Sequence, residues 1–545
     1  MGFCDTSVYY SDDAVSDYSV KDFSDIEEEY AEACNVCASL EILCGYSDGT
    51  FRGGMPMTRG ELSSAIYKIL GYEPTNYNPE KSFFDIPEDY PYRNAIISAV
   101  NDGYLTAEQG AYLPNNAVTP TEAVYASLKL LGLAQLAELR GIFPTATSAK
   151  ILDKVKYSAT SIDRQNTAQL LLNTILADRV KISGISEYIF TEKSGCFLED
   201  TFSAKKLTGV IGETGFGCAF EDKAPTLEQN EILIDGIKLK YNKDCLDLLG
   251  KNTLCYAQLN DYNDEGEVIW LAPYRVDEVK ITASQLGESN TKNRIEYYKF
   301  ESSSKATEIK IPDTCAVIYN GQYYTDITNA PNNIFDIPNG TLTIIYNNKS
   351  SAPNLVKVDC YTNYVVDTLS IPNSMIYDKY NKAPLCTDKS KGNTLLMKNG
   401  IEISVSELKT NDVLSVSIPK SSNGYTIIRL SDIAPVSGVL KTVEGNRFTV
   451  GRDAYALSQD IDKTKYSVSD YLTIYFDFNN IIAYITKLNQ EDYAYLVKPV
   501  YDSEENECCF KMFTFENGKG SFRAAKTVYV YWSNGTSNRY TDSNY

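Results

Sequence analysis

The chain contains no histidine, and this absence removes most of the common catalytic arrangements. Serine–histidine and cysteine–histidine nucleophile pairs, imidazole general bases and histidine-ligated zinc all need the missing residue. A pair of carboxylates or a lysine base could still do chemistry, but the sequence shows no pattern typical of either. We therefore predict that the chain is not an enzyme.

The 13 cysteines are the other residues that could hold a metal ion. Only Cys34, Cys37 and Cys44 form a cluster ahead of the pair Cys508-Cys509, and no second Cys-x2-Cys completes a four-ligand zinc site. We interpret the three clustered cysteines as small buried residues of one helix and predict no cofactor. Calcium stays a candidate, at sites that the sequence does not locate.

The most informative stretch is residues 45–61, Gly-Tyr-Ser-Asp-Gly-Thr-Phe-Arg-Gly-Gly-Met-Pro-Met-Thr-Arg-Gly-Glu. Asp48-Gly49 is a pair that tolerates the positive φ angles of a tight turn. Thr58 and Glu61 have the spacing of a capping box, and an apolar helical run follows from Leu62 to Leu70. The stretch therefore predicts a helix end, a glycine-rich loop and the start of a second helix.

These two motifs together resemble the S-layer homology (SLH) module, in which a Gly-Tyr-x-Asp-Gly-x-Phe loop precedes Thr-Arg-Ala-Glu. Gly60 in place of alanine is the one departure in the second motif. The resemblance implies an exported surface protein of a clostridia-like bacterium, located in the cell wall or S-layer. It also implies a partner, the secondary cell wall polymer, a glycan that carries pyruvylated sugars.

In that family the arginine of the second motif lies in a groove between units that receives the polymer. A guanidinium can bind a pyruvate carboxylate through two hydrogen bonds. We expect Arg59 to carry most of the binding, because Pro120 occupies the matching position in the second unit. We also expect Arg59→Ala to leave folding intact. The candidate binding residues are Asp48, Gly49, Arg52, Thr58, Arg59, Asp163 and Arg164.

The helical part is predicted to contain three related units after an N-terminal extension at residues 1–21. Phe23 precedes Thr58 by 35 residues, and Phe83 precedes Thr119 by 36, so the first two units repeat one length. The third unit is degenerate. The units span residues 22–75, 82–133 and 134–180 within the helical region 22–180.

After Val180 short β runs alternate with polar turns, so we predict small all-β barrels or sandwiches in series. The fold class is therefore multidomain α+β, with an N-terminal three-unit α-helical bundle. A partial repeat joins Thr208–Ile211 to Ser437–Leu440. A strand at 524–532 without a partner predicts that the last β domain is incomplete and that the native chain continues. The β domains are placed at 181–280, 281–370, 371–435, 436–490 and 491–545.

Composition excludes some partners. The net charge of −21 and a pI near 4.6 leave no basic face for nucleic acid. No apolar run approaches the roughly 18 residues of a membrane span. Residues 1–20 contain no lysine or arginine and no apolar core, so no signal peptide is visible.

The sequence thus predicts a structural, S-layer-like surface protein that binds wall polymer non-covalently. Such an acidic protein is expected to self-assemble into a lattice or oligomers, helped by divalent cations. The alternative is a wall-anchored polysaccharide-active enzyme or a carbohydrate-binding adhesin. An enzyme would ordinarily bring one large catalytic domain, which serial small β units do not provide. An outer-membrane protein ranks last, because its strands should be longer than those here.

Overall fold

The architecture comes from a computed structural model of the chain. It describes residues 23–72, 82–183, 190–221, 225–241, 245–299, 305–399, 401–420, 424–487, 494–502, 507–514, 518–523, 527–531 and 537–541. The predicted N-terminal extension lies outside these ranges. The chain forms two compact units. Unit one contains Met1–Tyr361, Lys389–Glu402 and Ser417–Ile427, and unit two contains Thr362–Asp388, Ile403–Val416 and Ile428–Tyr545.

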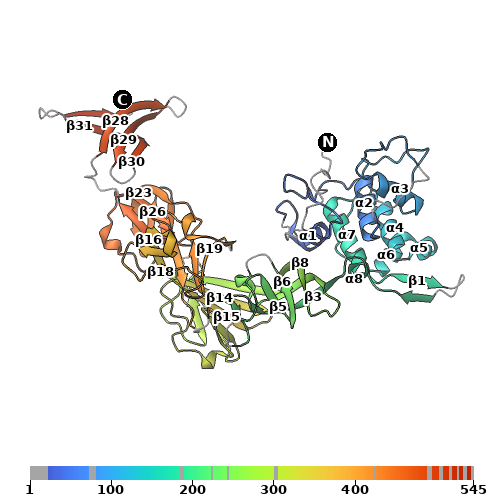
Figure 1. Ribbon diagram of the computed structural model, residues 1–545, viewed down its shortest axis with the longest axis horizontal. Helices are drawn as coiled ribbons and strands as arrows, with labels where there is room; N and C mark the ends of the chain where they lie inside the picture. The colour runs from blue at the N-terminus through green and yellow to red at the C-terminus, as the bar shows by residue number, and fades with distance from the viewer. Residues whose placement is uncertain are drawn as a thin grey trace. The chain divides into compact units, whose positions relative to one another are not determined.

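The N-terminal part of unit one is helical (Figure 1). Reciprocal capping boxes begin α2 and α4, formed by Thr58 with Glu61 and by Thr119 with Glu122, as their spacing predicts. Asp163 caps α7 by accepting a hydrogen bond from the backbone of Asn166. The helices are α1 (Ala31–Ser39), α2 (Arg59–Ile69), α3 (Arg93–Asn101), α4 (Pro120–Leu130), α5 (Ala134–Arg140), α6 (Ile142–Ser148), α7 (Arg164–Leu176) and the short α8 (Phe197–Asp200).

A closed ring of backbone hydrogen bonds relates the starts of α2, α4 and α7. Met57 N–H donates to Ile162 O (3.0 Å), Val118 N–H to Met57 O (2.8 Å), and Ile162 N–H to Val118 O (3.3 Å). Each of the three residues immediately precedes a helix N-cap and is buried. The three helix starts are therefore equivalent positions around a pseudo-threefold point. The boundaries of the three units stay a prediction.

The helical core extends onto the first sheet. Tyr256 of strand β7 (Asn252–Leu259) and Trp270 of strand β8 (Glu265–Pro273) lie in the same apolar cluster as α1 to α7. Cys34 and Cys37 are buried on α1 as expected, but Cys44 lies beyond the helix end, so the prediction of one helix for all three is wrong. Among the described residues, none of the helices has the length and apolarity to cross a membrane.

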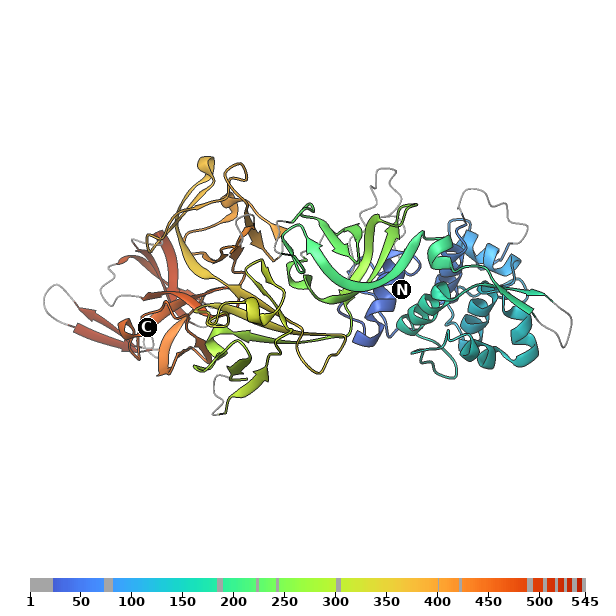
Figure 2. The ribbon, with the colours of Figure 1, turned by 90° about the horizontal axis from the view of Figure 1, so that it is seen from below.

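Two sheets dominate the rest of unit one. The first has the order β4-β3-β5-β6-β8-β7, and it closes on itself because β3 also pairs with β7. Figure 2 shows its long strand β3 curling around the sheet. The second has the order β13-β12-β15-β14-β9. The strands are β3 (Ala204–Thr214), β4 (Gly217–Cys218), β5 (Glu231–Ile234), β6 (Ile237–Lys240), β7 (Asn252–Leu259), β8 (Glu265–Pro273), β9 (Val276–Thr282), β12 (Ala316–Tyr319), β13 (Gln322–Tyr324), β14 (Gly340–Asn347) and β15 (Leu355–Cys360).

The described residues of unit two form β-strands with three short 3-10 turns, at Ile371–Asn373, Val405–Glu407 and Lys463–Lys465. Its strands are β16 (Thr362–Ser370), β17 (Met375–Asp378), β18 (Leu385–Cys386), β21 (Val413–Ser417), β23 (Val436–Glu444), β24 (Arg447–Val450), β25 (Asp453–Ala456), β26 (Tyr471–Phe476), β27 (Ile482–Lys487), β28 (Ala494–Asp502), β29 (Glu507–Thr514), β30 (Gly518–Arg523), β31 (Thr527–Tyr531) and β32 (Ser537–Thr541). β31 pairs with β32, which corrects the prediction of a final strand without a partner. The remaining strands of the chain are β1 (Val180–Ser183), β2 (Phe190–Lys193), β10 (Arg294–Tyr297), β11 (Thr307–Lys310), β19 (Thr394–Lys398), β20 (Ile401–Glu402) and β22 (Thr426–Leu430).

One backbone device recurs three times in the β region. Strands β3, β16 and β23 each carry a register shift, at Ile211, Val366 and Leu440, and all three residues are fully buried. The carbonyl of each accepts a hydrogen bond from a residue with positive φ: Gly250, Asn411 and Ser469, respectively. The partial repeat seen in the sequence joined the first and third copies and missed the one at Val366.

Candidate functional site

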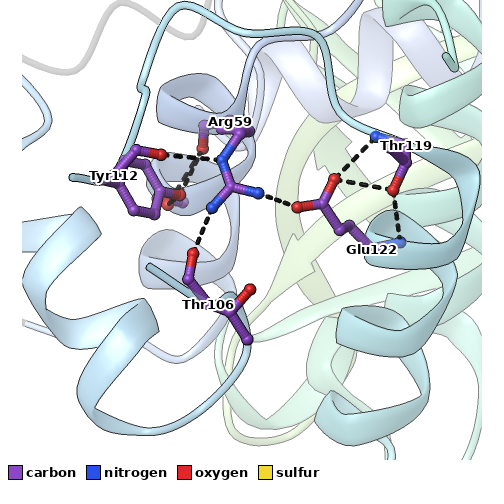
Figure 3. Close-up of polar contacts among 6 residues, drawn as sticks. Arg59, Thr106, Tyr112, Thr119 and Glu122 are labelled. Carbon is purple, nitrogen blue, oxygen red and sulfur yellow. Dashed lines mark hydrogen bonds and ion pairs between the residues drawn. The ribbon is translucent and has the colours of Figure 1, made fainter. Parts of the chain in front are cut away.

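Arg59, the first residue of α2, reaches into the loop that precedes α4 (Figure 3). Its Nε donates to the Tyr112 carbonyl at 3.0 Å, Nη1 pairs with the Glu122 carboxylate, and Nη2 donates to the Thr106 carbonyl. The guanidinium carbon lies 4.7 Å from the centre of the Tyr112 ring. With 12% of its side chain exposed, Arg59 joins its own helix to the next unit.

Arg164, the first residue of α7, repeats this arrangement against the loop before α2. Its Nε donates to Phe51 O (3.0 Å), Nη2 donates to Cys44 O (2.8 Å), and Nη1 pairs with Glu61. Its side chain is only 3% exposed. The third equivalent position is Pro120, which is buried and has no side-chain donor.

The capping-box glutamates serve both contacts. Glu122 accepts the Thr119 backbone N–H through Oε2 (2.9 Å) and Arg59 through Oε1. Glu61 likewise accepts the Thr58 N–H through Oε2 (3.0 Å) and Arg164 through Oε1. A motif that begins a helix is therefore also the acceptor for the neighbouring unit's arginine.

An aspartate fixes each loop in place. The Asp25 carboxylate accepts the backbone N–H groups of Phe51 (2.9 Å) and Arg52 (2.6 Å). Asp85 does the same for Tyr112 (2.9 Å) and Leu113 (2.6 Å). Asp25 and Asp85 each stand two residues after the phenylalanines, Phe23 and Phe83, whose spacing indicated the repeat, so the repeat itself was the signal for them.

Arg52 differs from the other two arginines because its guanidinium faces solvent. It pairs with Asp48 at 2.8 Å, lies 3.8 Å from the centre of the Tyr46 ring, and keeps 37% of its side chain exposed. Asp48 also accepts the N–H (3.0 Å) and hydroxyl (2.6 Å) of Thr50. The bonds from Thr50 and then Arg52 hold the pKa of Asp48 well below its usual range, and Asp48 raises the pKa of Arg52.

The structure thus sorts the predicted site residues into three positions. Asp48, Gly49 and Arg52 lie in one loop, and Arg164 approaches it from α7, with its guanidinium carbon 4.9 Å from the Tyr46 ring centre. Thr58 and Asp163 cap helices, and Arg59 belongs to the next contact along. Sequence reasoning missed Tyr46, Glu61, Tyr112 and Glu122 as parts of the site, although Tyr46 and Glu61 stand inside the two motifs.

Gly60 has a packing reason. A Cβ atom there would lie 3.1 Å from a ring carbon of Tyr92, 3.3 Å from the Pro114 carbonyl oxygen and 3.3 Å from the Tyr90 hydroxyl. Since the two tyrosines and this carbonyl crowd the helix start, alanine would fit only if they shifted.

Within the described ranges, no group of three or more Cys, Asp or Glu side chains is placed to hold a metal ion.

Comparison with known proteins agrees with these motifs. The family profile described as the S-layer homology domain matches residues 22–63. A cell surface protein of Thermoanaerobacter kivui is 23% identical over 379 residues, which cover 65% of this chain and 46% of that protein. Exoglucanase XynX of Acetivibrio thermocellus is 31% identical over 101 residues, 18% of this chain and 9% of the enzyme.

Amylopullulanase of Thermoanaerobacterium thermosulfurigenes is 28% identical over 117 residues, 21% of this chain and 6% of the enzyme. The chain therefore spans less than half the length of these curated relatives. The matched profile covers the loop with Arg52, the capping box and Arg59. This chain carries an S-layer homology domain.

Proposed function

We propose that the chain is a cell-surface protein held non-covalently to the wall, and that its helical part binds an acidic secondary cell wall polymer with pyruvylated sugars. The observation that supports this is the accessible guanidinium of Arg52. Arg59 and Arg164 each donate three hydrogen bonds to protein acceptors. Among the described residues Arg52 instead pairs with the Asp48 carboxylate and keeps part of its side chain exposed.

A pyruvate ketal presents one carboxylate on a sugar ring. A planar guanidinium can hold that carboxylate through two hydrogen bonds, which a lysine cannot. The Arg52 guanidinium lies over the Tyr46 ring and pairs with Asp48. These two contacts restrict the side chain before a ligand binds, so little conformational entropy is lost on binding. We assign the primary carboxylate contact to Arg52, with Arg59 and Arg164 shaping the neighbouring surface.

For the β region we propose a structural role. Serial β domains on a wall-bound anchor, with a net charge of −21, would assemble into a lattice or oligomers once divalent cations screen the charge. The similarity to polysaccharide-active enzymes covers about a fifth of this chain and under a tenth of each enzyme. It therefore supports a shared anchor rather than a shared activity.

The test is a sedimentation assay of the full chain with purified cell walls, before and after mild acid removes the pyruvate ketals. Arg52→Gln should weaken binding about tenfold, because one charge-assisted contact is lost. Lys68→Gln is the matched control, since Lys68 is an exposed cation on α2 that pairs only with Glu41 among the described residues. Treated walls should retain neither parent nor variant.

Equal binding by Arg52→Gln and the parent would refute the assignment to Arg52. Arg59→Lys and Arg164→Lys keep the positive charge but lose the fork of donors. If Arg59→Lys alone abolishes binding while its thermal transition is unchanged, the polymer lies against α2 as the family resemblance implies.

A further inference from the structure

A second group of side chains with ligand-binding character lies in unit two. We call Lys379, Tyr380, Asn411, Tyr475 and Tyr484 the tyrosine–lysine cluster. Tyr475 on β26 and Tyr484 on β27 are cross-strand partners with ring centres 5.2 Å apart. Tyr380 approaches Tyr484 edge-on at 6.3 Å, and Lys379 Nζ lies 5.4 Å from the Tyr484 ring centre.

The register shift of β16 brings the polar members together. Lys379 N–H donates to Val365 O and Asn411 N–H donates to Val366 O, each at 2.9 Å. The two residues flank the shift on consecutive carbonyls, one following β17 and the other preceding β21. Burial raises the pKa of Tyr475, and the neighbouring Asn411 side chain lowers it, so the shift in β16 lies next to the strand pair β26–β27.

Within the described ranges, the cation of the cluster contacts an aromatic ring and lacks a carboxylate partner. Among the described residues, Lys379 forms no ion pair with a carboxylate, although the chain carries 72 Asp and Glu residues. Asn411 Oδ1 is buried and accepts no hydrogen bond within that part of the chain. The Asn411 amide lies beside the Tyr475 hydroxyl, and turning the amide by 180° would give Oδ1 that O–H as a donor, so Lys379 is the member of the cluster that offers an open charge. Tyr380 is 57% exposed, so a ligand could reach the group from solvent.

The equivalent place in the closed sheet of unit one, at the register shift of β3, provides an internal comparison. There the positive-φ residue is Gly250, and a Cβ atom on it would collide with Leu355, next to Ile318. The adjacent Lys251 pairs with Glu278, and the Asn347 amide donates to the Gly250 carbonyl. That position is closed by apolar packing with its charge paired. The same backbone device therefore does not by itself require exposed tyrosines or an unpaired lysine.

We propose that the tyrosine–lysine cluster is a binding site for a carboxylated saccharide. The apolar face of a sugar ring would pack on the exposed Tyr380 beside Tyr484, and its carboxylate would pair with Lys379. Aromatic side chains and one cation without a carboxylate partner in the described part of the chain match the apolar face and the charge of a uronic acid. A neutral sugar would leave Lys379 unpaired.

Isothermal titration of the full chain with oligogalacturonate and with cellohexaose tests this site. We expect saturable binding of the acidic oligosaccharide and at least about tenfold weaker binding of the neutral one. Tyr380→Ala should weaken the acidic ligand about tenfold, and Lys379→Gln should remove the preference for it. Tyr262→Ala is the matched control, because Tyr262 is 86% exposed in the β7–β8 hairpin of unit one.

Three results would overturn the proposal: no saturable binding of oligogalacturonate, equal loss in Tyr262→Ala and Tyr380→Ala, or unchanged preference in Lys379→Gln. Adding Arg52→Gln to each variant separates this site from the helical anchor. If binding is lost only when Arg52 is replaced, the acidic oligosaccharide binds the helical part and the cluster is a packing contact between neighbouring sheets.

Discussion

Arg164→Ala should destabilise the helical part strongly, contrary to the role of a free binding residue. The substitution leaves the Glu61 carboxylate, 13% exposed, without its cation and leaves the carbonyls of Phe51 and Cys44 without donors. Removing one partner of a buried ion pair costs about 3–5 kcal/mol. Arg59→Ala breaks a more exposed pair, at 12% and 24%, so we expect about 2–3 kcal/mol, and the sequence-based expectation of intact folding should not hold.

The chain offers a local probe for this measurement. Trp270 lies in the helical core beside Tyr256, and Trp532 is the only other tryptophan. In a Trp532→Phe background, tryptophan fluorescence during urea unfolding therefore reports the core that α7 shares. Arg52→Ala, at an exposed pair, should leave the urea midpoint unchanged.

A double-mutant cycle with Arg164→Met and Glu61→Gln isolates the pair. We expect a coupling of at least about 2 kcal/mol, because both groups are largely buried and neither forms a second ion pair within the part of the chain that the structure describes. A loss below about 1 kcal/mol for Arg164→Ala, or a coupling near zero, would show that solvent replaces these contacts. The interpretation that the Arg164 side chain stabilises the contact between units would then be wrong.

Two further predictions concern the same region. Pro120→Arg should lower stability by about 1–3 kcal/mol in the same fluorescence assay, because Pro120 is buried and Asn166 stands where the neighbouring unit would need a glutamate; an unchanged midpoint would contradict this. Wall binding should stay constant between about pH 5.5 and 8, since the chain has no histidine, the pKa of Asp48 is lowered and that of Arg52 is raised. The lowered pKa of Asp48 keeps its pairing present above its unfolded pKa and loses it only as pH falls through the folded value, so a binding midpoint near pH 6–7 would refute this assignment.

Local spacing made part of the fold predictable. The capping boxes at Thr58 and Thr119 depend on residues three positions apart, and both form as predicted. The arginine contacts could not be read in the same way, because Arg59 meets Glu122 across 63 residues and Arg164 meets Glu61 across 103. No local pattern records which side chain a guanidinium meets after the chain has folded back.

The β repeat shows a different limit. Gly250, Asn411 and Ser469 occupy one backbone position with φ of 80°, 74° and 82°, yet they share no side-chain type. Sequence similarity identifies the strands at Ile211 and Leu440 as related but does not identify the strand at Val366. Backbone conformation is what recurs there, and glycine, asparagine and serine reach it at different energetic cost.

The three equivalent junctions of the helical part support one interpretation of the Thr-Arg-x-Glu motif. Arg59 meets Glu122 and Arg164 meets Glu61, so two junctions have both the donor and the acceptor. At the third, the donor position is Pro120 and the acceptor position is Asn166, so both are missing together. An arginine that served only the polymer would not need a glutamate in the following unit. The arginine and the glutamate are present together or absent together at each junction. We therefore assign ligand contact to the exposed Arg52, and we assign the Thr-Arg-x-Glu motif to contacts between units.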